Sequence, residues 1–172
     1  MEFYFHPSAC SFATNIVLEE AGLDCEITQN AESENELAHG GFTSFSSKQK
    51  YAQTLKCENG AMLTEVPVII QMIAHLAPQA NLAPQVGTLE HFKLQNWISF
   101  ISNEVLIHFA PFRTPDSNKD WREDSMSRLR HSFNILETHF ESNDYLMTGC
   151  RYSIADAYLF TILRMAESFK IN

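Results

Sequence analysis

The sequence lacks closely spaced cysteines and the histidine pattern of a metal site, and each absence excludes a class of site. Its 172 residues include four cysteines, and no two of them form a Cys-x-x-Cys pair. Disulfide frameworks and zinc knuckles both need closely spaced cysteines, so neither is expected. Because no His-Glu-x-x-His motif is present either, we expect no metal site.

Positive charge and long apolar runs are also scarce. There are 12 lysines and arginines against 21 aspartates and glutamates, which gives a net charge of -9. Nucleic-acid binding needs a basic surface, so we expect no nucleic-acid partner. No apolar run is long enough for a membrane span and no basic leader is present, which predicts a cytoplasmic protein with no membrane partner.

The N-terminal third of the chain predicts short strands around one helix. An aromatic run over Phe3–Phe5 indicates a strand, and apolar residues at helical spacing indicate a helix over Phe12–Ala21. Polar and apolar residues alternate over Asp24–Thr28, as they do in a half-buried strand. Further along, Asn59-Gly60 separates two apolar runs, which is the strongest hairpin signal in the chain.

The rest of the chain predicts helices only. Thr64 is placed to cap a helix that runs from Glu65 to about Leu76. Beyond a proline-rich linker, amphipathic patterns predict three further helices, over Thr88–Phe109, Trp121–Phe140 and Ser153–Phe169. The last of these opens with Ser153 and Asp156, three residues apart, in a capping-box pattern. Strands and helices followed by helices alone predict an α+β fold.

Four segments make the chain resemble the bacterial beta-class glutathione S-transferases. They are HPSACSFATNIVLEEAGLD from His6, ENGAMLTE from Glu58, LQNWISFISNE from Leu94 and YSIADAYLFTILRMA from Tyr152. The resemblance implies a thioredoxin-like, glutathione-binding domain over residues 1–77, a linker over 78–86 and an all-helical domain over 87–172. It further implies that the protein is a homodimer and that glutathione is its co-substrate. The second substrate, an apolar electrophile or a disulfide, is then expected in the cleft between the domains.

Cys10 is the candidate catalytic residue. It follows a predicted strand and precedes a predicted helix, and the free N–H groups and dipole of a helix start favour a thiolate. The resemblance implies that Cys10 lies against the glutathione sulfur and forms a mixed disulfide with it, assisted by Ser11. The alternative is that Cys10 is a small, inert, buried hydrophobic residue.

The resemblance also implies a set of glutathione-binding residues along the chain. They are Ala52, Gln53, Thr64, Glu65, Val66, Ser99 and Asn103. Glu65 is expected to recognise the charged γ-glutamyl end of glutathione. At a helix start its carboxylate also interacts favourably with the helix dipole, and this effect alone would account for its presence.

The sequence departs from the family pattern at several of these places. Gln53 stands where the family has a cis-proline, and a cis bond before another residue costs ~2.5–4 kcal/mol, so we expect a trans peptide there. Phe5 replaces a tyrosine and cannot donate a hydrogen bond. Leu106 and Ile107 replace basic residues, although Ser99, Asn103 and Leu106 are spaced to share one helix face.

Two functions follow from these matches and departures. The retained Cys10 and Glu65 favour an enzyme that conjugates glutathione to small electrophiles or carries out thiol–disulfide chemistry. The lost proline and basic residues favour a degenerate member that binds a ligand or a protein as a scaffold. The chain ends soon after its last predicted helix, so we expect a divergent, C-terminally short member of the class.

Overall fold

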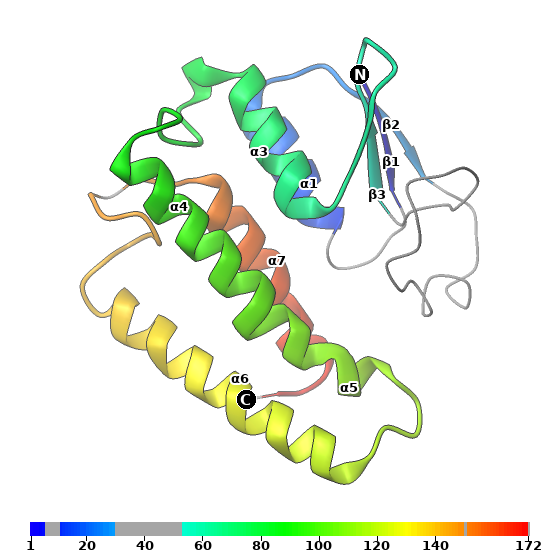
Figure 1. Cartoon of the computed structure of the whole chain (residues 1–172), viewed down its shortest axis with the longest axis vertical. Helices are drawn as coiled ribbons and strands as arrows, with labels where there is room; N and C mark the ends of the chain where they lie inside the picture. The colour runs from blue at the N-terminus through cyan, green and yellow to red at the C-terminus, as the bar shows by residue number, and fades with distance from the viewer. Residues whose placement is uncertain (6–10, 30–52, 150, 172) are drawn as a thin grey trace.

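The N-terminal part of the chain forms a mixed sheet covered by helices. The computed structural model describes residues 1–5, 11–29, 53–149 and 151–171, with Ser11 and Gln29 described through their backbone alone. The described strands are β1 (Glu2–Phe5), β2 (Glu26–Gln29), β3 (Gln53–Lys56) and β4 (Met62–Thr64). Their order in the sheet is β2-β1-β3-β4; β2 is parallel to β1, and β3 is antiparallel to both β1 and β4 (Figure 1).

The hairpin between β3 and β4 confirms the prediction from Asn59-Gly60. The Cys57 N–H donates to the Ala61 carbonyl (2.8 Å), and the Gly60 N–H donates to the Cys57 carbonyl (2.9 Å). Gly60 has a φ of 80°, which a residue without a Cβ adopts at little cost. The Asn59 side chain then accepts from the Ala61 N–H (3.0 Å) and completes the turn.

Two helices pack on one face of this sheet, α1 (Ser11–Ala21) and α3 (Val66–Leu76) (Figure 1). Phe3 of β1 and Leu55 of β3 pair in register and are fully buried beneath them. The strand predicted over Asp24–Thr28 begins later, at Glu26. The reason is tertiary, because the Glu26 N–H donates to the Met1 carbonyl (3.1 Å) and this pairing sets where β2 starts.

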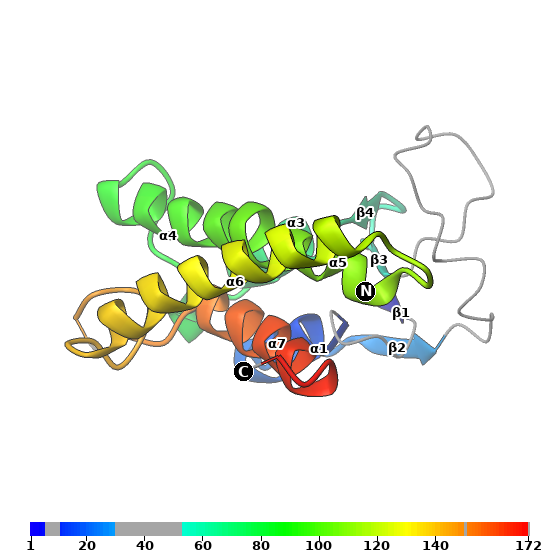
Figure 2. The ribbon, with the colours of Figure 1, turned by 90° about the horizontal axis from the view of Figure 1, so that it is seen from below.

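The helical part follows a short 3-10 helix, η1 (Pro78–Ala80). Its principal helices are α4 (Leu89–Phe100), α6 (Lys119–Phe140) and α7 (Ile154–Ser168). Figure 2 shows α7 beside α1, and the two helices are in contact. The buried apolar residues of both parts therefore form one continuous core. Within the described residues, none of the helices is both long and apolar enough to span a membrane.

The helix predicted over Thr88–Phe109 is not regular. After α4 the chain forms a π-helical segment, η2 (Ile101–Val105), a 3-10 helix, η3 (Leu106–Phe109), and a short helix, α5 (Ala110–Arg113). The Leu106 N–H donates to the Ile101 carbonyl, five residues earlier, which is the spacing of a π-helix. The apolar periodicity of the sequence was compatible with a straight helix and did not reveal this change.

Candidate functional site

The predicted site residues of the N-terminal part meet at one edge of the sheet. Because β1 and β4 both run antiparallel to β3, their C-terminal ends lie at the same edge. Gln53 pairs there with Phe5, and Thr64 pairs with Thr54. Figure 1 shows α1 and α3 beginning beside this edge, so two helix N-termini face the same region. Helix N-termini are favourable places for anionic groups.

The start of α3 differs from the predicted one. Thr64 ends β4 and pairs in the sheet, so the prediction that it caps the helix is wrong. Glu65 is the N-cap, with φ 71° and ψ 118°, and its side chain makes no capping hydrogen bond. Its carbonyl accepts from the N–H groups of Val68 and Ile69 (both 3.0 Å). The Glu65 side chain is exposed, so its carboxylate is available to a cationic ligand group.

Two other predicted residues at this edge are buried. Val66, the first residue of α3, is 7% exposed and packs in the core, so only its backbone can face a ligand. Gln53 is also 7% exposed, and its side-chain oxygen has no hydrogen-bond partner among the residues that the structure describes. A buried amide oxygen without a partner is uncommon in folded proteins.

Sequence analysis missed two polar residues near the start of α1. The Thr14 hydroxyl and the Asn15 side-chain oxygen are buried, and within the described ranges neither has a hydrogen-bond partner. Thr14 is fully buried. The sequence could have revealed Thr14 and Asn15 as two adjacent polar residues within a predicted helix whose other buried residues are apolar. Both residues lie one turn into the helix that Cys10 precedes.

Ser99 and Asn103 form a second group, on α4 and η2. The Asn103 side-chain amide donates to the carbonyl (3.0 Å) and to the hydroxyl (3.2 Å) of Ser99, and both residues are exposed. The prediction that Leu106 shares their face is wrong. Leu106 is half-buried against the core, whereas Ile107 is 56% exposed, because the π-helical segment changes the register after Asn103.

Several sequence predictions fall outside the described residues. Cys10 and Ala52 are among them, and so is the peptide bond between Ala52 and Gln53. The reactivity of Cys10 therefore stays a prediction. Ser11 begins α1 one residue before the predicted start, and the structure describes its backbone alone.

Comparisons with known proteins identify the family of the chain. The sequence family described as the glutathione S-transferase C-terminal domain matches residues 100–172 of this chain. A glutathione transferase structure from Methylococcus capsulatus is 34% identical, with a TM-score of 0.85 over 99% of this chain and 84% of that one. The chain belongs to the glutathione S-transferase family. The expected fold, a thioredoxin-like N-terminal part followed by a helical domain, is thereby confirmed.

Two further similarities concern bacterial members of the glutathione S-transferase family. Glutathione S-transferase GstA of Escherichia coli O157:H7 is 28% identical over all of this chain and 85% of its own length. The structure of the bacterial beta-class glutathione S-transferase of Sphingomonas chungbukensis is 26% identical. It has a TM-score of 0.82 and covers all of this chain and 85% of that chain.

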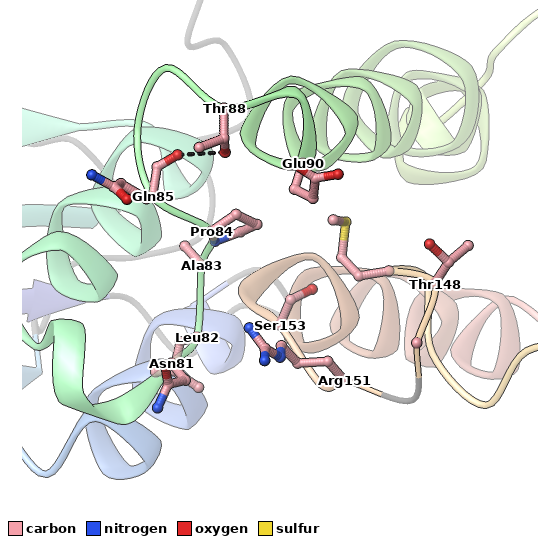
Figure 3. Close-up of a pocket in the computed structure, with 12 residues that line it drawn as sticks. Asn81, Leu82, Ala83, Pro84, Gln85, Thr88, Glu90, Thr148, Arg151 and Ser153 are labelled. Carbon is pink, nitrogen blue, oxygen red and sulfur yellow. Dashed lines mark hydrogen bonds between the residues drawn. The ribbon is translucent and has the colours of Figure 1, made fainter.

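A surface pocket of this glutathione S-transferase homologue lies away from the sheet edge. It is formed by the segment around Asn81–Thr88, the first turn of α4 and the loop before α7 (Figure 3). Glu90 lines it, and Ser99 follows Glu90 by nine helical steps, about 14 Å along α4 at ~1.5 Å per residue. The pocket therefore does not overlap the candidate glutathione site. Among the described residues, no cluster of potential ligands suits a metal ion.

Neither cysteine among the described residues lies at a helix start. Burial raises the pKa of the Cys25 thiol, which disfavours its thiolate. Cys57 is half-buried in the hairpin, away from any helix start. Burial also raises the pKa of Tyr152 to about 12, so this phenol is no base at neutral pH.

Proposed function

We propose that the chain is a beta-class glutathione transferase that binds glutathione at the sheet edge where α1 and α3 begin. The observation that carries the proposal is the open start of α3. There Glu65 has a left-handed φ of 71°, an exposed carboxylate and no capping hydrogen bond to its own helix. Similarity to bacterial glutathione S-transferases, one of them of the beta class, supports it.

The two charges at the γ-glutamyl end of glutathione match this helix start. Its ammonium group pairs with the Glu65 carboxylate, and its carboxylate accepts from the Val66 backbone N–H at the positive end of the helix dipole. Pro67 has no N–H, and the Val68 N–H already donates to the Glu65 carbonyl. Val66 contributes its backbone N–H, since its side chain is in the core. Thr64, Gln53 and Ala52 then lie along the rest of the peptide, while Ser99 and Asn103 approach it from the helical part.

The sulfur chemistry takes place at Cys10 and at Ser11, the first residue of α1. In conjugation, the glutathione thiolate forms a bond to the electrophilic carbon, and the leaving group departs with the electron pair of the broken bond. In thiol–disulfide exchange, the Cys10 thiolate attacks one sulfur of oxidised glutathione and forms a mixed disulfide. The other glutathione leaves as a thiolate.

The proposal includes the wider properties that the family resemblance implies. These are domains over residues 1–77 and 87–172 joined by a linker over 78–86, a cytoplasmic location, an apolar electrophile or disulfide as second substrate, and a C2 homodimer. Light scattering should give the mass of a dimer. A monomer at high micromolar concentration would contradict the dimer without touching the binding site.

A binding scaffold without transferase activity is the second candidate, and two observations favour it. Gln53 places a buried amide where the family has a cis-proline, and Val66, which packs in the core, offers no side-chain donor at the start of α3. Hydrogen bonds to charged groups contribute ~1.5–3 kcal/mol each, so these losses predict glutathione binding that is weaker than is usual for the family.

Titration calorimetry with glutathione tests the site, and mass spectrometry after brief alkylation tests the chemistry. We expect wild type to bind glutathione and Cys10 to be labelled faster than Cys25, Cys57 and Cys150. Oxidised glutathione should add to Cys10, and Cys10→Ala should abolish that adduct while the protein stays folded. Binding with an unreactive Cys10 would favour the scaffold. Absence of binding at millimolar glutathione would overturn the proposed site.

A further inference from the structure

The π-helical segment η2 lies directly under one of the proposed ligand-binding side chains. Asn103 is in its middle, and the segment ends where Val105 has φ -115° and ψ -65°. A π-helical turn shifts the helix register by one residue and weakens the regular backbone hydrogen bonding of the helix. Such turns therefore persist where neighbouring groups stabilise them, and they are frequent at functional sites. The stabilising group here comes from another helix.

That group is the hydroxyl of Ser132 on α6. It donates to the Glu104 carbonyl at 2.7 Å, across 28 residues of sequence. Ser132 is 2% exposed, so its hydroxyl has no access to bulk water and depends on this acceptor. The carbonyl belongs to the residue that follows Asn103, so the bond fixes the backbone on the C-terminal side of Asn103.

A second hydroxyl holds the same segment from its other side. Ser102 donates to the Ile98 carbonyl (2.9 Å), and its oxygen lies 3.3 Å from the Tyr158 hydroxyl of α7. With Ser102 and Glu104 both fixed, Asn103 is held on each flank. Its amide can then reach the Ser99 carbonyl and hydroxyl, both within 3.2 Å.

We propose that Ser132 is a positioning residue for glutathione binding: through the Glu104 carbonyl it holds the π-helical segment that carries Asn103, whose side chain bonds to Ser99 on α4. This inference rests on the proposed function, because it assumes that these two residues contact glutathione. Ser132 itself touches no ligand. Its loss frees the Glu104 carbonyl, so the backbone that carries Asn103 is held less firmly against α6.

The experiment compares Ser132→Ala with Ser125→Ala. Ser125 is a matched control because it is 1% exposed and lies two turns earlier on α6, with no hydrogen bond to η2 among the described residues. Glutathione affinity is measured by calorimetry at a temperature where thermal melts show both variants folded. We expect Ser132→Ala to weaken binding about three- to tenfold, the effect of one net hydrogen bond, and Ser125→Ala to bind as wild type does.

A double-mutant cycle with Asn103→Ala separates positioning from general loosening of the fold. If Ser132 acts through Asn103, Ser132→Ala has no further effect on affinity once Asn103 is alanine. Equal effects in both backgrounds would overturn the proposal. So would an affinity of Ser132→Ala equal to that of wild type.

Hydrogen exchange of the ligand-free protein keeps this test distinct from that of the proposed function. We expect amides of residues 99–109 to exchange faster in Ser132→Ala and to be unchanged in Ser125→Ala. If wild type binds no glutathione, the proposed function is wrong and the role of Ser132 in binding falls with it. Unchanged exchange in Ser132→Ala would contradict the structural part on its own.

Discussion

The starts of α3 and α7 are built in opposite ways. At α7 the Asp156 carboxylate accepts three hydrogen bonds, from the Ser153 N–H (2.9 Å), the Ser153 hydroxyl (2.8 Å) and the Leu146 N–H (2.8 Å). At α3 the N-cap is Glu65, whose side chain bonds to no helix N–H and whose backbone has a positive φ. The Asp156 carboxylate is hydrogen-bonded at the start of its own helix, whereas the Glu65 carboxylate is exposed to solvent.

The difference separates stability from binding. The starts of α4 and α6 resemble that of α7, since Thr88 accepts from the His91 N–H (3.2 Å) and Asn118 accepts from the Asp120 N–H (2.7 Å). A capped start satisfies its own N–H groups and stabilises the helix. The start of α3 has no side-chain cap and leaves the Glu65 carboxylate exposed, and a non-glycine residue with a positive φ is of the kind that is frequent at functional sites.

The largest effect on stability is expected at the start of α7. Asp156→Ala removes the acceptor of three donors and leaves the Leu146 N–H without a partner, so we expect a loss of about 2–4 kcal/mol in the free energy of unfolding. Urea denaturation measures it. Glu137→Ala, an exposed acidic residue of α6, should stay within about 0.5 kcal/mol of wild type. If Asp156→Ala loses less than about 0.5 kcal/mol in the free energy of unfolding, the start of α7 is not built for stability as argued above.

Glu65→Gln should have the opposite profile. Removing the charge that pairs with the γ-glutamyl ammonium should weaken glutathione binding about 10- to 100-fold, the equivalent of ~1.5–3 kcal/mol for a charge-assisted hydrogen bond. Its stability should stay within about 0.5 kcal/mol of wild type, since the exposed side chain has no partner in its own helix. Calorimetry and urea denaturation together check both halves. A variant that loses stability but keeps its affinity would show that Glu65 is structural.

Glu65→Gly should release the backbone strain at the start of α3. A non-glycine residue in a sparsely populated positive-φ region costs ~1–3 kcal/mol, and glycine removes most of this cost but adds flexibility to the unfolded chain. We therefore expect a gain of about 1 kcal/mol in stability together with loss of glutathione affinity. Thermal and urea unfolding provide the measurement. If glycine destabilises the protein, strain at this residue is not what distinguishes α3 from α7.

The smallest expected effect is on the pH dependence of stability, and it concerns His108 in the helical part. Burial and the nearby Arg128 guanidinium lower the pKa of His108, while Glu104 and Asp124 act in the opposite direction. Because the folded-state pKa lies below the unfolded value of ~6.5, the unfolded state binds the proton more readily. The contribution of neutral His108 is therefore present above pH ~6.5 and is lost as the pH falls.

His108→Gln should lose less stability than wild type between pH 7 and pH 5. Urea midpoints at the two pH values give the comparison. His75→Gln, an exposed histidine at the end of α3, is the control and should follow wild type. Identical pH dependence in wild type and His108→Gln would contradict this account of His108.

Features set by neighbouring residues were predictable from the sequence. The Asn59-Gly60 turn, the Asp156 partner of Ser153 and the order of strands and helices all depend on contacts a few residues apart or on periodicity. The pairing of Asp156 with Ser153 was predicted, but its bond to the Leu146 N–H was not, because that amide comes from the preceding loop.

The succession of elements and most helix ends could thus be predicted from the sequence, since turn geometry, capping and apolar spacing are local. Which polar groups the site presents depends instead on contacts between distant parts of the chain. Sheet pairing turned Thr64 into a strand residue and left Glu65 to begin α3, and core packing took the Val66 side chain out of reach. Likewise, the Ser132 hydroxyl on α6 meets η2 only because the two helices pack, so the register change that separates Asn103 from Leu106 depends on a contact 28 residues away in the chain.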